Sequence, residues 1–108
     1  MNRLQRKRSP GWRKPPNSIY IGRPTIHGND YRIGQIDSRT GKPTTVQEVV
    51  EAFERDIRTT LALAGRKRFF DFYIKPLLGK NLLCWCAPTS PCHGDVWLKL
   101  IAEFTRPE

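Results

Sequence analysis

The clearest succession of a strand and a helix lies in residues 81–104, which read NLLCWCAPTSPCHGDVWLKLIAEF. The opening run, Asn81–Cys86, is apolar and typical of a buried strand. A loop bracketed by prolines follows, and a helix is expected to begin near Cys92. Apolar side chains recur there at helical spacings, at Val96, Trp97, Leu100, Ile101 and Phe104. We expect Pro107 to close this helix.

One more strand and two more helical segments precede this stretch. Ser18–Gly22 is β-branched and aromatic and ends at a glycine, so we expect a strand there. Thr45 and Glu48 match a capping box that opens a helix, and Gly65 is suited to end it. The apolar face of this helix would comprise Val46, Val49, Val50, Phe53, Ile57, Leu61 and Ala64. A further helical stretch is expected from Arg66 to Leu78, weakened by Pro76.

The order of these elements predicts the fold class. Two strands separated by long helical segments cannot form a hairpin, so they are most simply parallel. We therefore expect a small single α/β domain over residues 18–106, with a short, mainly parallel sheet flanked by about three helices. A basic, extended N-terminal arm over residues 1–17 would precede the domain.

Composition excludes several classes of protein. The chain has 108 residues, enough for one domain, and a formal net charge of +9. Its apolar stretches are too short to span a membrane, and its start lacks the apolar block of a secretory signal. Three cysteines cannot form a closed set of disulfides, so we expect a reducing, cytoplasmic setting.

The basic charge is concentrated at the N-terminus. Prolines and glycines interrupt any helix there, so the segment is expected to be extended. One interpretation is an arm that binds nucleic-acid phosphates and offers an aromatic ring for stacking on bases. The alternative is a solubilising tail that contacts nothing. The residues of this arm would be Arg3, Arg6, Lys7, Arg8, Trp12, Arg13 and Lys14.

Ligands of open parallel sheets bind beyond the carboxyl ends of the strands. The topology therefore predicts a shared cleft, in which the tips of the Tyr20 and Trp85 segments lie side by side and Arg23 and His93 face one hollow. Gly94, at the start of the last helix, would let a phosphate approach the backbone. The expected ligand-binding residues are Arg23, His27, Asn29, Lys80, Cys92, His93, Gly94 and Asp95. The alternative is that these residues serve only turns and helix initiation.

The cysteines allow two kinds of chemistry. Cys84, Cys86, Cys92 and His93 form a candidate zinc site, because thiolates and imidazole are the ligands that zinc prefers. Their spacing is irregular, which favours reduced core thiols instead, so we assign no cofactor. A second interpretation makes Cys92 or Cys86 a nucleophile, with His93 or His27 as its base.

The motifs also resemble those of a known family, the domain of unknown function DUF4326, small domains found in bacteriophages and bacteria. The resemblance runs from about Ser18 to Phe104, and the basic arm lies outside it. Two features depart from the family pattern: Asp30 stands where Pro is usual, and the loop from Cys86 to Cys92 is about a residue longer. The matching motifs are Tyr20-Ile-Gly-Arg23, His27-Gly-Asn29, Tyr31-Arg-Ile-Gly34, Gly79-Lys80, Cys84-Trp-Cys-Ala-Pro88 and Cys92-His-Gly-Asp-Val96.

This resemblance implies a phage or bacterial intracellular setting and supplies no established activity. Our leading hypothesis is a small accessory protein that binds a nucleotide or nucleic-acid phosphate in the cleft, aided by the basic arm. Two alternatives stay open: a phage-encoded modulator that binds a host protein, and a Cys/His-dependent enzyme acting on a nucleotide or modified base. Phe69 and Phe70 are adjacent on a helix, so one of them would be exposed, for a partner protein or a second copy in a homodimer.

Overall fold

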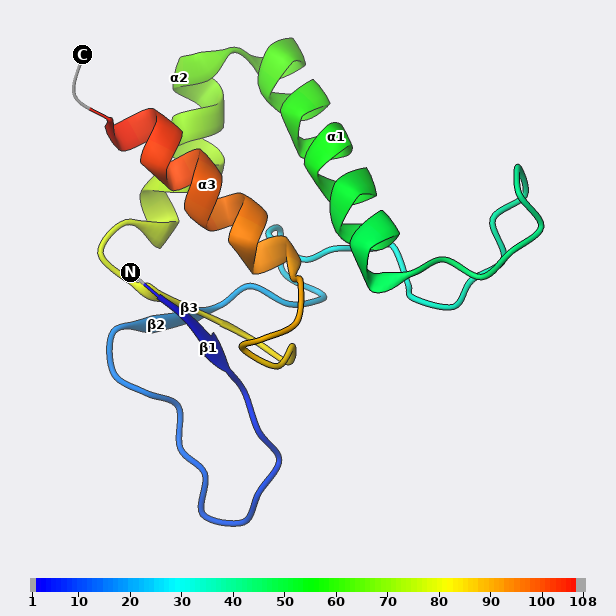
Figure 1. The fold of residues 1–108 in the computed structure, drawn as a ribbon. Coiled ribbons are helices and arrows are strands. Elements are labelled where there is room, and N and C mark those ends of the chain that lie inside the picture. The colour runs from blue at the N-terminus through cyan, green and yellow to red at the C-terminus, as the bar shows by residue number, and fades with distance from the viewer. Residues whose placement is uncertain (1, 107–108) are drawn as a thin grey trace.

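The computed structural model describes residues 2–106. Its sheet has three parallel strands, β1 (Arg3–Gln5), β2 (Ser18–Tyr20) and β3 (Asn81–Cys84), in the order β1-β3-β2 (Figure 1). Leu82 of β3 lies opposite both Arg3 and Ile19. The predicted α/β class and the parallel pairing of the Ser18 and Asn81 strands are therefore confirmed.

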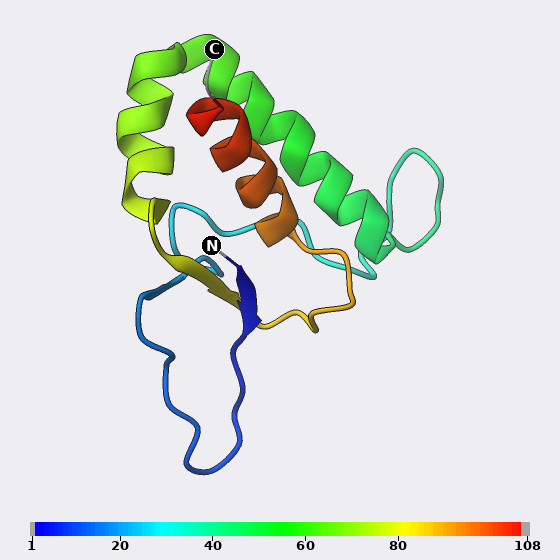
Figure 2. The same cartoon turned by 60° about the vertical axis from the view of Figure 1, so that its left-hand side comes forward.

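The helical elements lie together on one side of the sheet (Figures 1 and 2). They are α1 (Val46–Ala64), α2 (Arg66–Phe69), a π-helical turn η1 (Phe70–Ile74), a 3₁₀ turn η2 (Lys75–Leu77) and α3 (His93–Thr105). Within residues 2–106, no helix combines the length and the hydrophobicity needed to cross a membrane.

Both ends of α1 are as the sequence predicts. The Thr45 hydroxyl accepts a hydrogen bond from the Glu48 backbone N–H, and the Glu48 carboxylate accepts one from the Thr45 N–H, which completes the capping box. At the other end, Gly65 adopts a φ of 87° and donates to the Leu61 carbonyl. Glycine is suited to this turn because a Cβ atom disfavours positive φ.

Trp97 of α3 is the centre of the core. Its side chain is completely buried and its ring lies against those of Phe53, Phe69 and Tyr73. The indole N–H donates to the His27 carbonyl over 2.9 Å. The predicted apolar face of α3 is confirmed, with Val96, Trp97, Leu100 and Ile101 buried and Phe104 half-buried. Pro107, expected to close the helix, lies outside the described residues.

The stretch from Arg66 to Leu78 changes its helical type twice. Pro76 has no N–H to donate, so a regular α-helix cannot continue through it, and the chain ends in the 3₁₀ turn. The phenylalanines also differ from expectation. Phe69 is buried and Phe70 is half-buried against the Phe104 ring, so neither side chain is exposed. The exposed phenylalanine of this stretch is Phe72.

The N-terminal segment is not the separate arm that we expected. Arg3–Gln5 forms an edge strand of the sheet, and residues 6–17 are a loop that connects β1 to β2 (Figure 1). We call residues 6–17 the basic loop. Because the sheet holds both of its ends, the folded unit begins before Ser18.

Candidate functional site

The tips of the Tyr20 and Trp85 segments lie side by side, as the topology predicts. The indole N–H of Trp85 donates to the Tyr20 hydroxyl over 3.0 Å. A cavity of about 620 Å³ opens at this end of the sheet. Arg23, Asn29, Cys92 and His93 all line it, so the structure brings these predicted site residues together.

The lining of this cavity is cationic and aromatic. Arg8, Arg23 and Arg32 contribute positive charge, and no Asp or Glu occurs among the described residues that line it. Trp85, which is 38% exposed, presents its ring beside Tyr20. The Arg8 guanidinium lies 4.6 Å from the centre of the Trp85 ring, which is cation–π distance. The cavity therefore combines positive charge with exposed aromatic surface.

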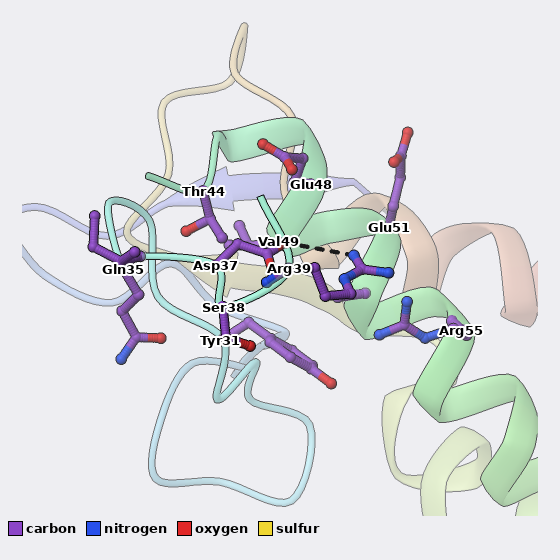
Figure 3. A pocket seen from close by; sticks show the side chains of 12 residues that line it. Tyr31, Gln35, Asp37, Ser38, Arg39, Thr44, Glu48, Val49, Glu51 and Arg55 are labelled. Carbon is purple, nitrogen blue, oxygen red and sulfur yellow. Dashed lines mark hydrogen bonds and ion pairs between the residues drawn. The ribbon is translucent and has the colours of Figure 1, made fainter. Parts of the chain in front are cut away.

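A second cavity, of about 560 Å³, lies between α1 and the loop of residues 31–44 (Figure 3). Its charges are mixed: Glu48, Glu51 and Asp37 accompany Arg39 and Arg55. Asp37 and Arg39 form an ion pair with each other, 3.4 Å apart. These opposite charges offset one another, so this cavity has less attraction for an anion than the one beside Trp85.

His93 and His27 are both buried, but only His93 faces the cavity. The His93 Nε2–H donates to the Ile21 carbonyl over 2.7 Å, which leaves Nδ1 as the unprotonated nitrogen, 3.6 Å from the Cys92 sulfur. His27 Nε2–H donates to the Tyr73 carbonyl, and the ring packs against Trp97. His27 is therefore a structural residue, contrary to its predicted place in the ligand site.

Burial also makes both imidazoles poor bases. It lowers the pKa of His27 and the pKa of His93, because the charged form of a buried ring loses its hydration. An imidazole in the unfolded chain titrates near 6.5. Between that pH and the lower folded values, the unfolded state binds more protons than the folded state.

We expect the free energy of unfolding to fall as the pH drops from 6.5 toward 5. Each histidine contributes at most about 1.4 kcal/mol per pH unit, and the contribution becomes constant only above about pH 7.5, where the unfolded imidazole is almost fully deprotonated. Urea unfolding followed by circular dichroism at pH 7.5, 6 and 5 measures this slope. His93→Gln should roughly halve it, and a stability that is equal at all three pH values would contradict the prediction.

Three thiols meet at the base of the cavity. The sulfur atoms of Cys84, Cys86 and Cys92 all lie within 4.8 Å of one another, an arrangement that could hold a metal ion. The Cys84 and Cys92 sulfurs are 3.4 Å apart. His93 does not belong to this group: its Nε2–H donates to the Ile21 carbonyl, and its Nδ1 lies 3.6 Å from the Cys92 sulfur. Of the four predicted zinc ligands, the structure groups the three cysteines.

The pKa values of the thiols shift in opposite directions. Hydrogen bonding by the Cys86 and Cys92 thiols, with help from Arg3, lowers the pKa of Cys84. The same bonds raise the pKa of Cys92, which is buried and accepts a hydrogen bond from the Gly94 N–H as the N-cap of α3. Cys92 is therefore not the activated nucleophile that its place at a helix N-terminus suggested. Of these two thiols, Cys84 is the one whose pKa is lowered.

Arg3 organises the loop that carries these cysteines. Its side chain is only 8% exposed. The guanidinium donates to the carbonyls of Ala87, Pro88 and Ser90, over 3.2, 2.8 and 2.8 Å. It also lies 3.8 Å from the Cys84 sulfur and forms an ion pair with Asp95. Arg3 is thus a positioning residue, buried against this loop and not exposed as a nucleic-acid arm would require.

Three other predicted ligand residues have different roles. The Asp95 carboxylate caps α3 by accepting from the Cys92 N–H over 3.1 Å. A Cβ atom on Gly94 would lie 2.8 Å from the Arg3 side chain, so this glycine makes room for Arg3 and not for a phosphate. Lys80 directly precedes β3 and is at the amino end of the strand, away from the cavity.

The basic loop contributes unevenly to the site. Arg6 lies over the Tyr20 and Trp85 rings, 4.8 and 4.9 Å from their centres, and Arg8 lines the cavity. Trp12 is half-buried at a turn, where its backbone N–H donates to the Ser9 carbonyl. The remaining cations of the loop, Lys7, Arg13 and Lys14, are exposed.

Four residues that line the cavity were not among the expected ligand-binding residues: Tyr20, Tyr31, Arg32 and Trp85. Tyr20 and Trp85 lie at the carboxyl ends of β2 and β3, and this position alone could have indicated them. Tyr31 and Arg32 belong to an irregular loop, for which no periodicity gives an orientation.

A family model described as a domain of unknown function, DUF4326, matches residues 4–103, nearly the whole chain. The match begins inside β1, so the expectation that the basic segment lies outside it is wrong. Comparison with curated proteins and with solved structures gave no match. Because the family model covers nearly the whole chain, from within β1 to within α3, this chain belongs to the DUF4326 family.

Proposed function

We propose that this protein binds a nucleotide, or the phosphate and base of a nucleic acid, in the cavity beside Trp85. The observation that carries the proposal is the composition of the cavity: three arginines, three aromatic rings and no carboxylate among its described lining residues. Guanidinium groups bind phosphate in a bidentate manner. An indole stacks on a base, and here a base would take the place of the Arg6 or Arg8 guanidinium that lies over the Trp85 ring.

Charge around the cavity supports the same ligand class. Among residues 2–106, no carboxylate forms an ion pair with Arg8, Arg23 or Arg32, so these guanidinium groups are available to an anion. The exposed cations of the basic loop raise the local positive potential and would speed the approach of a polyanion. We place this activity in the cytoplasm of a bacterium or of a phage-infected cell, where three free thiols stay reduced.

Fluorescence anisotropy with labelled single-stranded DNA and RNA, over a series of salt concentrations, tests the proposal. Unlabelled mononucleotides added as competitors show whether one nucleotide is sufficient. Arg23→Gln should weaken binding about tenfold, the loss of one charge-assisted hydrogen bond. It should also reduce the slope of log K against log salt by about 0.7, the value for one phosphate contact on a single strand.

The matched control is Arg68→Gln, which removes the same charge from an exposed position on α2. It should change affinity by much less than Arg23→Gln, and circular dichroism should show that both variants are folded. Absence of binding by the unaltered protein at low salt would refute the proposal. If Arg23→Gln and the unaltered protein bound with equal affinity, the cavity would not be the binding site.

A further inference from the structure

We propose that Cys84, Cys86 and Cys92 bind one Zn²⁺ ion as thiolates. The three sulfurs lie within 4.8 Å of one another, and Cys84 and Cys92 are 3.4 Å apart. Two thiolates on a tetrahedral zinc ion, with Zn–S bonds of about 2.3 Å, are about 3.8 Å apart. The observed spacing is thus close to that of a formed site, and small side-chain rotations suffice to reach it.

Two secondary-structure elements and the loop between them bring these sulfurs together. Cys84 ends β3, Cys86 follows it by two residues, and Cys92 is the N-cap of α3. Arg3 of β1 holds the loop between Cys86 and Cys92 by donating hydrogen bonds to three of its carbonyls. The loop therefore places Cys92 beside Cys84. A preorganised set of ligands binds a metal more tightly than a mobile one, because less conformational entropy is lost.

The surroundings of the three cysteines suit a metal–thiolate centre better than purely apolar surroundings would. All three cysteines line the cavity and Cys86 is half-buried, so an ion has a route to them. Three thiolates and Zn²⁺ carry a net charge of −1, and the Arg3 guanidinium, 3.8 Å from the Cys84 sulfur, offsets it. The soft sulfur ligands select zinc over magnesium or calcium. Binding releases the thiol protons to solvent and involves no oxidation.

Titration of the reduced, metal-free chain with Co²⁺ and then Zn²⁺ tests this inference, which does not depend on nucleotide binding. One Co²⁺ should bind per chain and give the thiolate-to-cobalt charge-transfer absorption of three sulfur ligands, and Zn²⁺ should abolish it. Zinc should also raise the thermal unfolding midpoint, because it binds only the folded state.

Cys86→Ser is the most informative variant, since Cys86 is the least buried of the three residues. It should lower zinc affinity at least tenfold and reduce the charge-transfer intensity by about a third. Ser90→Ala, in the same loop, should leave both unchanged. Thermal unfolding without metal verifies that each variant folds. Failure of the unaltered chain to bind one metal ion, or equal affinity in Cys86→Ser, would overturn the inference.

Discussion

Trp97→Ala is expected to lower the free energy of unfolding by about 3–5 kcal/mol, the usual cost of truncating a buried aromatic residue to alanine. The indole is completely buried, so its removal leaves a cavity between Phe53, Phe69 and Tyr73. A domain of this length has a total stability of about 5–15 kcal/mol. The substitution therefore removes a large part of that stability, and urea unfolding followed by circular dichroism measures it.

Two further variants separate the causes of this loss. Trp97→Phe keeps most of the packing but removes the N–H that donates to the His27 carbonyl, and should cost about 1–3 kcal/mol. Trp12→Ala makes the same truncation in the half-buried turn of the basic loop and should cost less than about 1 kcal/mol. Equal losses for Trp12→Ala and Trp97→Ala would mean that α3 does not organise the core.

The elements that could be predicted are those whose signals are local. The apolar spacing and the capping box of α1 depend on residues within a few positions of one another, and the same holds for the apolar face of α3. Strand β1 has no such signal. It is short, lies at an edge of the sheet and pairs Arg3 with Leu82, a partner far away in the sequence. Its charged neighbours made it resemble a solvated tail.

The same distinction applies to the site. That Tyr20 and Trp85 meet follows from parallel pairing, because the carboxyl ends of neighbouring strands share one edge. The individual roles of the basic residues do not follow from their clustering in the sequence. Arg3 is buried against the loop after β3, Arg8 lines the cavity, and Arg13 is exposed. These differences depend on the direction of each side chain, which the charge pattern does not contain.

Arg3→Met is expected to lower the free energy of unfolding by about 2–3 kcal/mol and to loosen the cysteine-bearing loop. Methionine retains the apolar stem but loses the donors to Ala87, Pro88 and Ser90. Hydrogen bonds from a charged donor contribute about 1.5–3 kcal/mol each when buried. The combined loss is smaller than their sum, because the Ala87 and Pro88 contacts are exposed to water and Asp95 is about half exposed.

Arg13→Met is the matched control for this variant, because it removes the same charge from an exposed position of the basic loop. It should change stability by less than about 0.5 kcal/mol and leave the cysteine-bearing loop intact. Hydrogen exchange should be faster in Arg3→Met at residues 87–92 and unchanged there in Arg13→Met. If both variants had the free energy of unfolding and the hydrogen-exchange rates of the unaltered protein, the Arg3 guanidinium would not be what holds Cys92 beside Cys84. The three sulfurs would then need another cause for their convergence, such as the metal ion itself.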